Sequence, residues 1–142
     1  MSQGRRNDLA VCFARLGDAL VVFDATRVER FVDSSEYSDG VDLDVAEALD
    51  VKLASGMLSR RVVLFRTDRG PFAARLGEHL QLETLPANRV QSFPLFVREL
   101  ADRSRLLGFV VRDREFAFVI DLEALAREWS PPQRDEVERM TG

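Results

Sequence analysis

The sequence predicts a mainly β protein in which two small β-barrel units pack together and the helices are short. Apolar runs of alternating pattern recur along the chain between turn residues, which is typical of antiparallel strands. Two similar sets of such runs follow one another, which indicates an internal repeat. Few helical stretches lie between them, so a barrel or sandwich is favoured over a parallel sheet with alternating helices.

The length of the chain suits one domain. It has 142 residues, of which 46% are hydrophobic, and this is enough for a real core. We divide it into a flexible N-terminus at residues 1–7, a shortened first β unit at residues 8–58, a second β unit at residues 59–130 and a C-terminal helix or tail at residues 131–142. Small residues around Ser55 mark the predicted linker.

The first unit opens with a predicted hairpin. Residues 9–13 and 19–23 form two apolar strands around a turn at residues 17–18. Another strand is predicted to begin at residues 31–32. Residues 41–51 are amphipathic and predict a short helix.

The second unit repeats this order. Residues 62–67 and 71–76 predict a hairpin around the turn at residues 68–70. A strand at residues 80–85 then stops at a proline, and residues 95–100 predict one or two helical turns.

The closing segment is the most strongly patterned part of the chain. Residues 109–111 and 116–120 predict a last hairpin, and Asp121 is the expected N-cap of a helix that carries Leu122 and Leu125. We expect the core of the second unit to be centred on six residues of its strands: Phe65, Phe72, Leu82, Phe109, Phe118 and Ile120.

The repeat is visible in two pairs of segments. Residues 13–23 correspond to residues 64–74 in their order of apolar, turn and apolar positions. Residues 41–43 and 120–122 each place an apolar residue, an aspartate and a leucine before an apolar-faced helix. Two similar small β units are therefore predicted.

Composition limits the classes of function. Basic residues at positions 103, 105, 112 and 114 are interleaved with acidic ones, so no nucleic-acid partner is expected. The single histidine, His79, and the single cysteine, Cys12, predict no metal site, and no cofactor is expected. No apolar run reaches the roughly 18 residues of a membrane span. We expect a cytoplasmic protein without direct membrane insertion.

An acidic interval lies between Arg30 and Lys52, where no basic residue occurs. Its acidic members are Asp33, Glu36, Asp39, Asp42, Asp44, Glu47 and Asp50. Two explanations stay open: a solvated loop and helix face, or a docking surface for a basic partner.

Catalysis is not expected. Asp121, Glu123 and Arg127 could be imagined as an acid and base pair, but a helix cap and an i, i+4 salt bridge account for them. The sequence carries no Walker loop, no GxSxG motif and no dinucleotide-binding fingerprint. A non-enzymatic binding module is therefore predicted, with no catalytic residue.

These segments together resemble the CheW-like domain of bacterial chemosensory adaptors and histidine kinases. The similarity is best at residues 62–86 and 106–125, which look like that family's later hairpin with its following strand and its closing glycine, hairpin and Asp-Leu-helix. The opening hairpin at residues 13–32 is also similar. With the repeat, the resemblance implies two small SH3-like β-barrel subdomains, of which the first is reduced.

One segment departs from that family. Its members carry a strand pair with an Asn-Leu-Arg-Gly motif where this chain has only residues 31–40. They bind receptor tips and the regulatory domain of the kinase CheA through surfaces that include this strand pair. The resemblance thus implies an adaptor that binds a CheA-type histidine kinase, a receptor or another array component. A diverged scaffold or targeting protein for a different partner is the alternative, and the resemblance also leaves a homodimer open.

The missing strand pair predicts an open sheet edge in the first unit. We expect this edge at the strand near Phe31 or at the strand of residues 19–23. The predicted partner-binding residues beside it are Val21, Phe23, Phe31, Asp39 and Val41. In the other interpretation, the loop at residues 34–40 or the C-terminal helix covers the gap.

Overall fold

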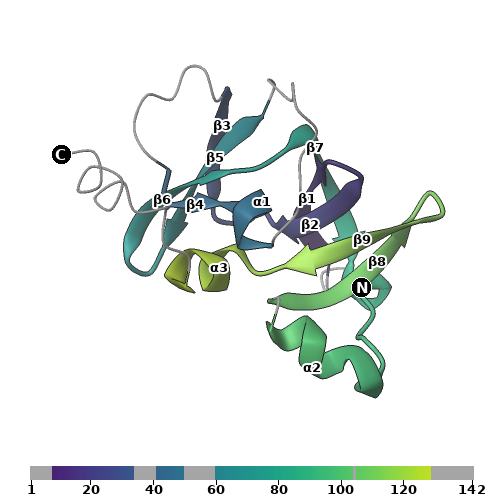
Figure 1. The fold of residues 1–142 in the computed structure, drawn as a ribbon. Helices are drawn as coiled ribbons and strands as arrows, with labels where there is room; N and C mark the ends of the chain where they lie inside the picture. Colours follow the sequence, from purple (N-terminus) through teal and green to yellow (C-terminus); the bar gives the residue numbers. More distant parts are fainter. Residues whose placement is uncertain (1–7, 34–40, 50–59, 104, 129–142) are drawn as a thin grey trace, which may run out of the picture.

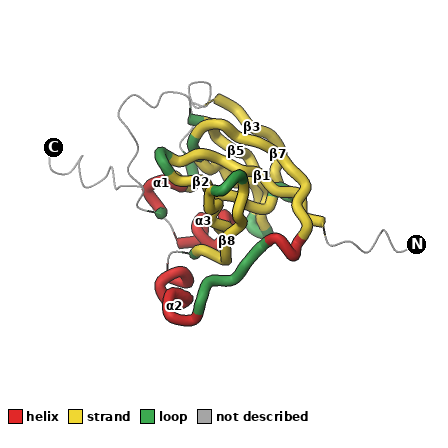
Figure 2. Tube along the Cα trace, turned by 90° about the vertical axis from the view of Figure 1, so that its right-hand side faces the viewer, coloured by secondary structure: helices red, strands yellow, loops and turns green. Residues whose placement is uncertain are grey.

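The computed structural model describes residues 8–33, 41–49, 60–103 and 105–128, with side chains described in these ranges except at 101–103. The predicted N-terminal segment, the linker and the C-terminal helix or tail lie outside the described residues. Strands dominate the described chain, as predicted (Figures 1 and 2).

Within the described ranges, five strands form one sheet, sheet A, in the order β7-β1-β2-β9-β8. They are β1 (Asp8–Leu16), β2 (Ala19–Asp24), β7 (Glu78–Pro86), β8 (Leu106–Arg112) and β9 (Glu115–Ile120). β1 pairs antiparallel with β2 and β7, and β8 pairs antiparallel with β9. β2 and β9, from opposite ends of the chain, pair in parallel.

Sheet A closes on itself through Gln91, which follows β7 and the 3-10 turn η3 (Ala87–Arg89). The backbone N–H of Gln91 donates to the carbonyl of Phe109 in β8 at 2.8 Å, and the N–H of Phe109 donates to the Gln91 carbonyl at 2.9 Å. A Cβ atom at Gly108 would lie 2.4 Å from that carbonyl oxygen, so this close approach of two backbones requires glycine.

Within the same ranges, four strands form the second sheet, sheet B, in the order β3-β5-β6-β4. They are β3 (Val28–Asp33), β4 (Leu43–Asp44), β5 (Arg61–Thr67) and β6 (Gly70–Arg75). Helix α1 (Val45–Ala48) follows β4, and α3 (Leu122–Glu128) follows β9. The two helices contact each other beside the sheets, whereas α2 (Leu95–Arg103) contacts β8 (Figure 1).

The predicted repeat appears in the structure as two interleaved halves. The hairpins β1-β2 and β5-β6 are equivalent, and each lies parallel to a strand that comes from the other half and leads into a helix. β7 flanks β1 as β3 flanks β5. Both sheets therefore contain strands from each side of the predicted boundary at residues 58 and 59. Among the described residues, sheet B has no counterpart of β8, in accordance with a reduced unit.

The main core lies where the two sheets and the helices α1 and α3 meet. It includes Cys12 and Phe23 from sheet A, Val63 and Leu76 from the second hairpin, and Leu125 from α3. A second, smaller cluster fills the interior of sheet A; its buried members are Val11, Phe13, Leu20, Val22, Leu85, Val110 and Ala117. Sequence neighbours in β1 and β2 thus alternate between the two cores.

The predicted core of the second unit is correct in part. Phe65 and Ile120 are buried, and Phe72 is half-buried against the main core. Leu82 is 62% exposed, so its assignment to the core is wrong. Phe109 and Phe118 are half-buried, because the opposite face of these strands, with Val110 and Ala117, lines the interior of sheet A.

Two aspartates begin the short helices. The Oδ1 atom of Asp121 accepts a hydrogen bond from the N–H of Ala124 at 3.0 Å, which confirms the predicted cap. Asp44 caps α1, which is shorter than the predicted helix at residues 41–51. Asp42 instead joins that segment to β6, since its Oδ2 atom accepts from the N–H of Ala73 at 2.8 Å.

Replacing Phe118 with alanine is expected to cost about 2 kcal/mol of unfolding free energy. A fully buried phenylalanine would cost about 3–5 kcal/mol, but Phe118 is only half-buried on the outer face of β9. Urea unfolding followed by circular dichroism measures the change. A loss of 4 kcal/mol or more, on the order of the fully buried case, would contradict this placement.

Candidate partner-binding surfaces

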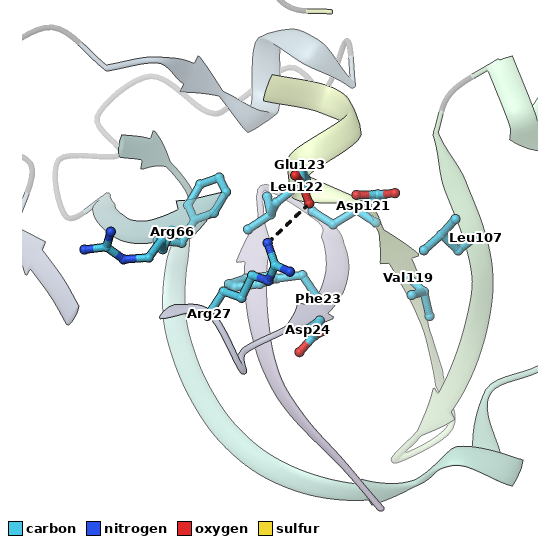
Figure 3. A pocket seen from close by; sticks show the side chains of 11 residues that line it. Phe23, Asp24, Arg27, Arg66, Leu107, Val119, Asp121, Leu122 and Glu123 are labelled. Atoms are coloured by element: carbon cyan, nitrogen blue, oxygen red, sulfur yellow. Dashed lines mark ion pairs between the residues drawn. The ribbon is translucent and has the colours of Figure 1, made fainter. Parts of the chain in front are cut away.

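A pocket of about 350 Å³ opens where the ends of β2, β5 and β9 and the first turn of α3 come together (Figure 3). Its apolar lining residues are Phe23, Phe65, Leu107, Val119, Ile120 and Leu122. Charged side chains also line it: Asp24, Arg27, Arg66, Asp121 and Glu123. We call this the junction pocket, because residues of both sheets form it.

The charged groups of the junction pocket are held by neighbouring protein groups. The Nη1 atom of Arg27 lies 3.2 Å from Oδ1 of Asp68 and 4.0 Å from Oε2 of Glu123. The Asp24 carboxylate accepts from the N–H of Thr26 at 2.8 Å. Arg66 points away from the pocket in Figure 3 and lies 3.6 Å from Glu29. An apolar floor with a mixed-charge rim suits the recognition of a side chain from another protein.

The charged residues that could form an acid and base pair, Asp121 and Glu123, have structural roles. Asp121 caps α3, and Glu123 pairs with Arg27 at 4.0 Å, not with the helical neighbour Arg127 that the sequence suggested. Burial raises the pKa of the Cys12 thiol to about 11, with a smaller opposing effect of the Gln81 backbone, so the thiol is neutral and packs as an apolar group. In the described ranges, no three histidine, cysteine, aspartate or glutamate residues gather to hold a metal ion.

β3 lies at an edge of sheet B (Figure 2). It pairs with β5, and its other side faces no further strand of the described chain. Phe31 in β3 is half-buried and packs against the main core. Val41, also half-buried, directly precedes the Asp42 that bonds to β6, so its segment lies at the opposite edge of sheet B and not beside β3 as predicted. Asp39 lies outside the described residues.

The prediction that β2 could be the open edge is wrong. β2 pairs with β1 on one side and with β9 on the other. Val21 and Phe23 are 2% and 1% exposed, so both side chains lie in the main core. Phe23 still reaches the floor of the junction pocket. The sequence could not exclude β2 as an edge, because its neighbour β9 comes from the far end of the chain.

β4 is fixed in sheet B by a buried ionic cluster. Asp44 accepts from Arg60 at 2.7 Å and 3.1 Å, lies 3.5 Å from Arg75, and caps α1 through the N–H of Ala46 at 3.1 Å. Arg60 also donates to the carbonyl of Leu76 at 2.7 Å. The cluster holds the last strand of the reduced sheet in position.

Exposed apolar residues that the sequence interpretation missed lie on α2 and on the β8-β9 hairpin. On α2, Leu95, Phe96 and Leu100 are 78%, 88% and 64% exposed. On β9, Phe116 is 57% exposed and meets the ring of Phe109 edge-on. The apolar pattern of α2 was visible in the sequence, but the side on which the helix packs was not.

Two interleaved β sheets pack around a shared core, and the second sheet is shortened; this arrangement is a CheW-like fold. A solved structure with this fold is similar to the chain: the scaffolding protein TtCheW from Thermoanaerobacter tengcongensis. The two share 11% sequence identity and a TM-score of 0.61, over 82% of this chain and 91% of that one. No protein-family profile matches the sequence, and no curated protein matches it.

The helices of the described chain were also compared with the length of a membrane span. None of those helices is long and apolar enough to cross a bilayer.

Proposed function

We propose that this protein is a non-catalytic adaptor of a bacterial chemosensory system that works in the cytoplasm. It binds a CheA-type histidine kinase, a receptor or another component of the array. The observation that carries this proposal is the CheW-like fold, which extends over 82% of the chain. The scaffolding protein with the same fold supports an adaptor role over an enzymatic one.

The partner contact is proposed at the open side of sheet B. In the sequence, Phe31 in β3 and Val41 before β4 flank the segment in which the chain is shortened; in sheet B, β3 and β4 are the two opposite edges. An unpaired strand offers backbone N–H and C=O groups to a strand of another chain, and half-buried apolar side chains beside it add contact area. Asp39 is proposed to guide a basic approach, whereas Val21 and Phe23 support this surface from the core.

A second candidate is a diverged scaffold that docks a partner outside the chemoreceptor array. The shortened sheet B favours it, since the strand pair with the Asn-Leu-Arg-Gly motif is absent from the sequence. Affinity capture from native cell extract, followed by mass spectrometry, separates the two. Recovery of a CheA-type kinase or a chemoreceptor supports the adaptor, and recovery of an unrelated complex without either supports the alternative.

Replacing Phe31 with aspartate is expected to weaken capture of the partner at least tenfold, since a truncated hot-spot residue costs about 2 kcal/mol or more. Val41→Asp should act in the same direction. The protein should stay folded, with a melting temperature lower by about 10 °C, because Phe31 is only half-buried and its replacement costs about 2 kcal/mol. Titration of the purified partner and thermal unfolding give the two measurements.

Phe116→Asp is the matched control, because it changes an exposed phenylalanine on the other sheet. It should leave partner capture unchanged if sheet B carries the contact. If Phe31→Asp and Val41→Asp both unfold the protein, the two residues belong to the core, and the interpretation of a covered edge is correct.

A further inference from the structure

The open side of β3 carries a defined order of charged and apolar residues. Its pairing with β5 is regular from Arg30 to Asp33, after a bulge at Glu29. Arg30 and Asp33 are exposed, and Phe31 and Val32 between them are half-buried. Any strand that is added here meets these four side chains in a fixed order.

A second copy of β3 fits this edge poorly. Two copies that extend one antiparallel sheet are related by a two-fold axis perpendicular to it, so only positions on the same face can lie opposite each other. A pair centred on Phe31 sets Glu29 against Asp33 of the other copy. A pair centred on Val32 sets the charged Asp33 against the apolar Phe31 of the other copy. A pair centred on Arg30 sets the Arg30 side chains of the two copies against each other. Like charges directly opposite destabilise a strand pair.

Arg30 is the charge on β3 that a partner would have to match. The two acidic residues of β3 already have partners: Asp33 lies 3.1 Å from Arg61, and Glu29 lies 3.6 Å from Arg66. No ion pair joins Arg30 to another residue of the described ranges. Opposite charges facing each other across an antiparallel pair stabilise it.

We propose that the strand added to β3 comes from a different protein and places an acidic side chain opposite Arg30. In the antiparallel register, apolar residues lie opposite Phe31 and Val32, and a basic residue lies opposite Asp33. This inference rests on the proposed function, in which sheet B receives a partner. It names the chemistry of that partner: an extended segment in which two apolar residues separate a basic from an acidic one.

Two capped synthetic peptides of the same composition test the inference. The matched peptide, Thr-Lys-Val-Ile-Glu-Thr, places its glutamate opposite Arg30 and its lysine opposite Asp33 in the antiparallel register. The exchanged peptide, Thr-Glu-Val-Ile-Lys-Thr, reverses both charges. NMR titration of the full chain should give about threefold to tenfold tighter binding of the matched peptide. Arg30→Glu should remove this preference, and Arg30→Glu combined with Asp33→Arg should reverse it.

Arg114→Glu is the control, since it makes the same change of charge at an exposed residue of the β8-β9 turn, in the other sheet. Equal binding of the two peptides would overturn the charge preference. A wild-type dimer in sedimentation that Arg30→Glu dissociates would assign the edge to a second copy and overturn the inference. If neither peptide binds at concentrations on the order of 1 mM but Phe31→Asp still abolishes partner capture, the inference fails and the proposed function stands. If neither peptide binds and Phe31→Asp does not weaken partner capture, both the inference and the proposed function fail.

Discussion

Replacing Phe23 with alanine is expected to lower the free energy of unfolding by about 3–5 kcal/mol. The side chain is 1% exposed and packs in the main core, where residues of both sheets and of α3 surround it. Truncation removes buried apolar area and leaves a cavity that neighbouring strands, fixed by their hydrogen bonds, fill only in part. Because a domain of this size is stable by about 5–15 kcal/mol in total, the change is large. Urea unfolding followed by circular dichroism measures it.

Phe116→Ala is the matched control, since the Phe116 side chain is 57% exposed. Its loss should stay below about 1 kcal/mol. Equal losses for the two variants would show that the packing around Phe23 is not the core of the protein.

Replacing Arg60 with alanine is expected to cost about 3–5 kcal/mol at neutral pH, since it leaves the Asp44 carboxylate buried without its main partner. The side chains of Arg60 and Asp44 are 14% and 8% exposed, so water replaces the lost partner poorly. Arg61→Ala is the control in the next residue. Its ion pair with Asp33 is about half exposed and should contribute less than about 1 kcal/mol.

The loss of unfolding free energy in Arg60→Ala should depend on pH. Burial raises the pKa of Asp44, but the hydrogen bonds and charge of Arg60 outweigh it and hold this pKa below the ordinary value of 3.8. A folded-state pKa below the unfolded one gives stability that is fully present above pH 3.8 and is lost as the pH falls through the folded value. The difference between wild type and Arg60→Ala should therefore shrink as the pH falls below about 3.8. A constant difference over that range would assign the loss to packing instead of to the charge.

Local features of the structure could be predicted from the sequence. The three hairpins follow from apolar alternation around short turns, and Asp121 was recognisable as a cap because its hydrogen bond reaches only three residues along the chain. A strand near Phe31 was predicted as well and lies at a sheet edge, although it begins at Val28 and not at residues 31–32.

Features that depend on distant residues could not be predicted. The parallel pairing of β2 with β9 buries Val21 and Phe23, yet nothing in residues 19–24 indicates that partner. The apolar alternation of β9 does not show which of its two faces is buried. The sequence predicts the aromatic face, with Phe118, as the interior, but the opposite face, with Ala117, lines the interior of sheet A. The bond between Arg60 and Asp44 joins two charged residues that local patterns place on the surface.

The interleaving of the two halves sets the order in which the protein can fold. During synthesis β1 and β2 leave the ribosome first, but their neighbour β9 is made near the end of the described chain. One side of the first hairpin therefore stays unpaired until synthesis is almost complete. The pairing of β2 with β9 joins residues that are far apart in the sequence, and such pairing slows folding. Two barrels arranged one after the other could fold independently, whereas here each half supplies strands that complete the other. A nascent or truncated chain thus exposes the strand edges that the finished protein covers.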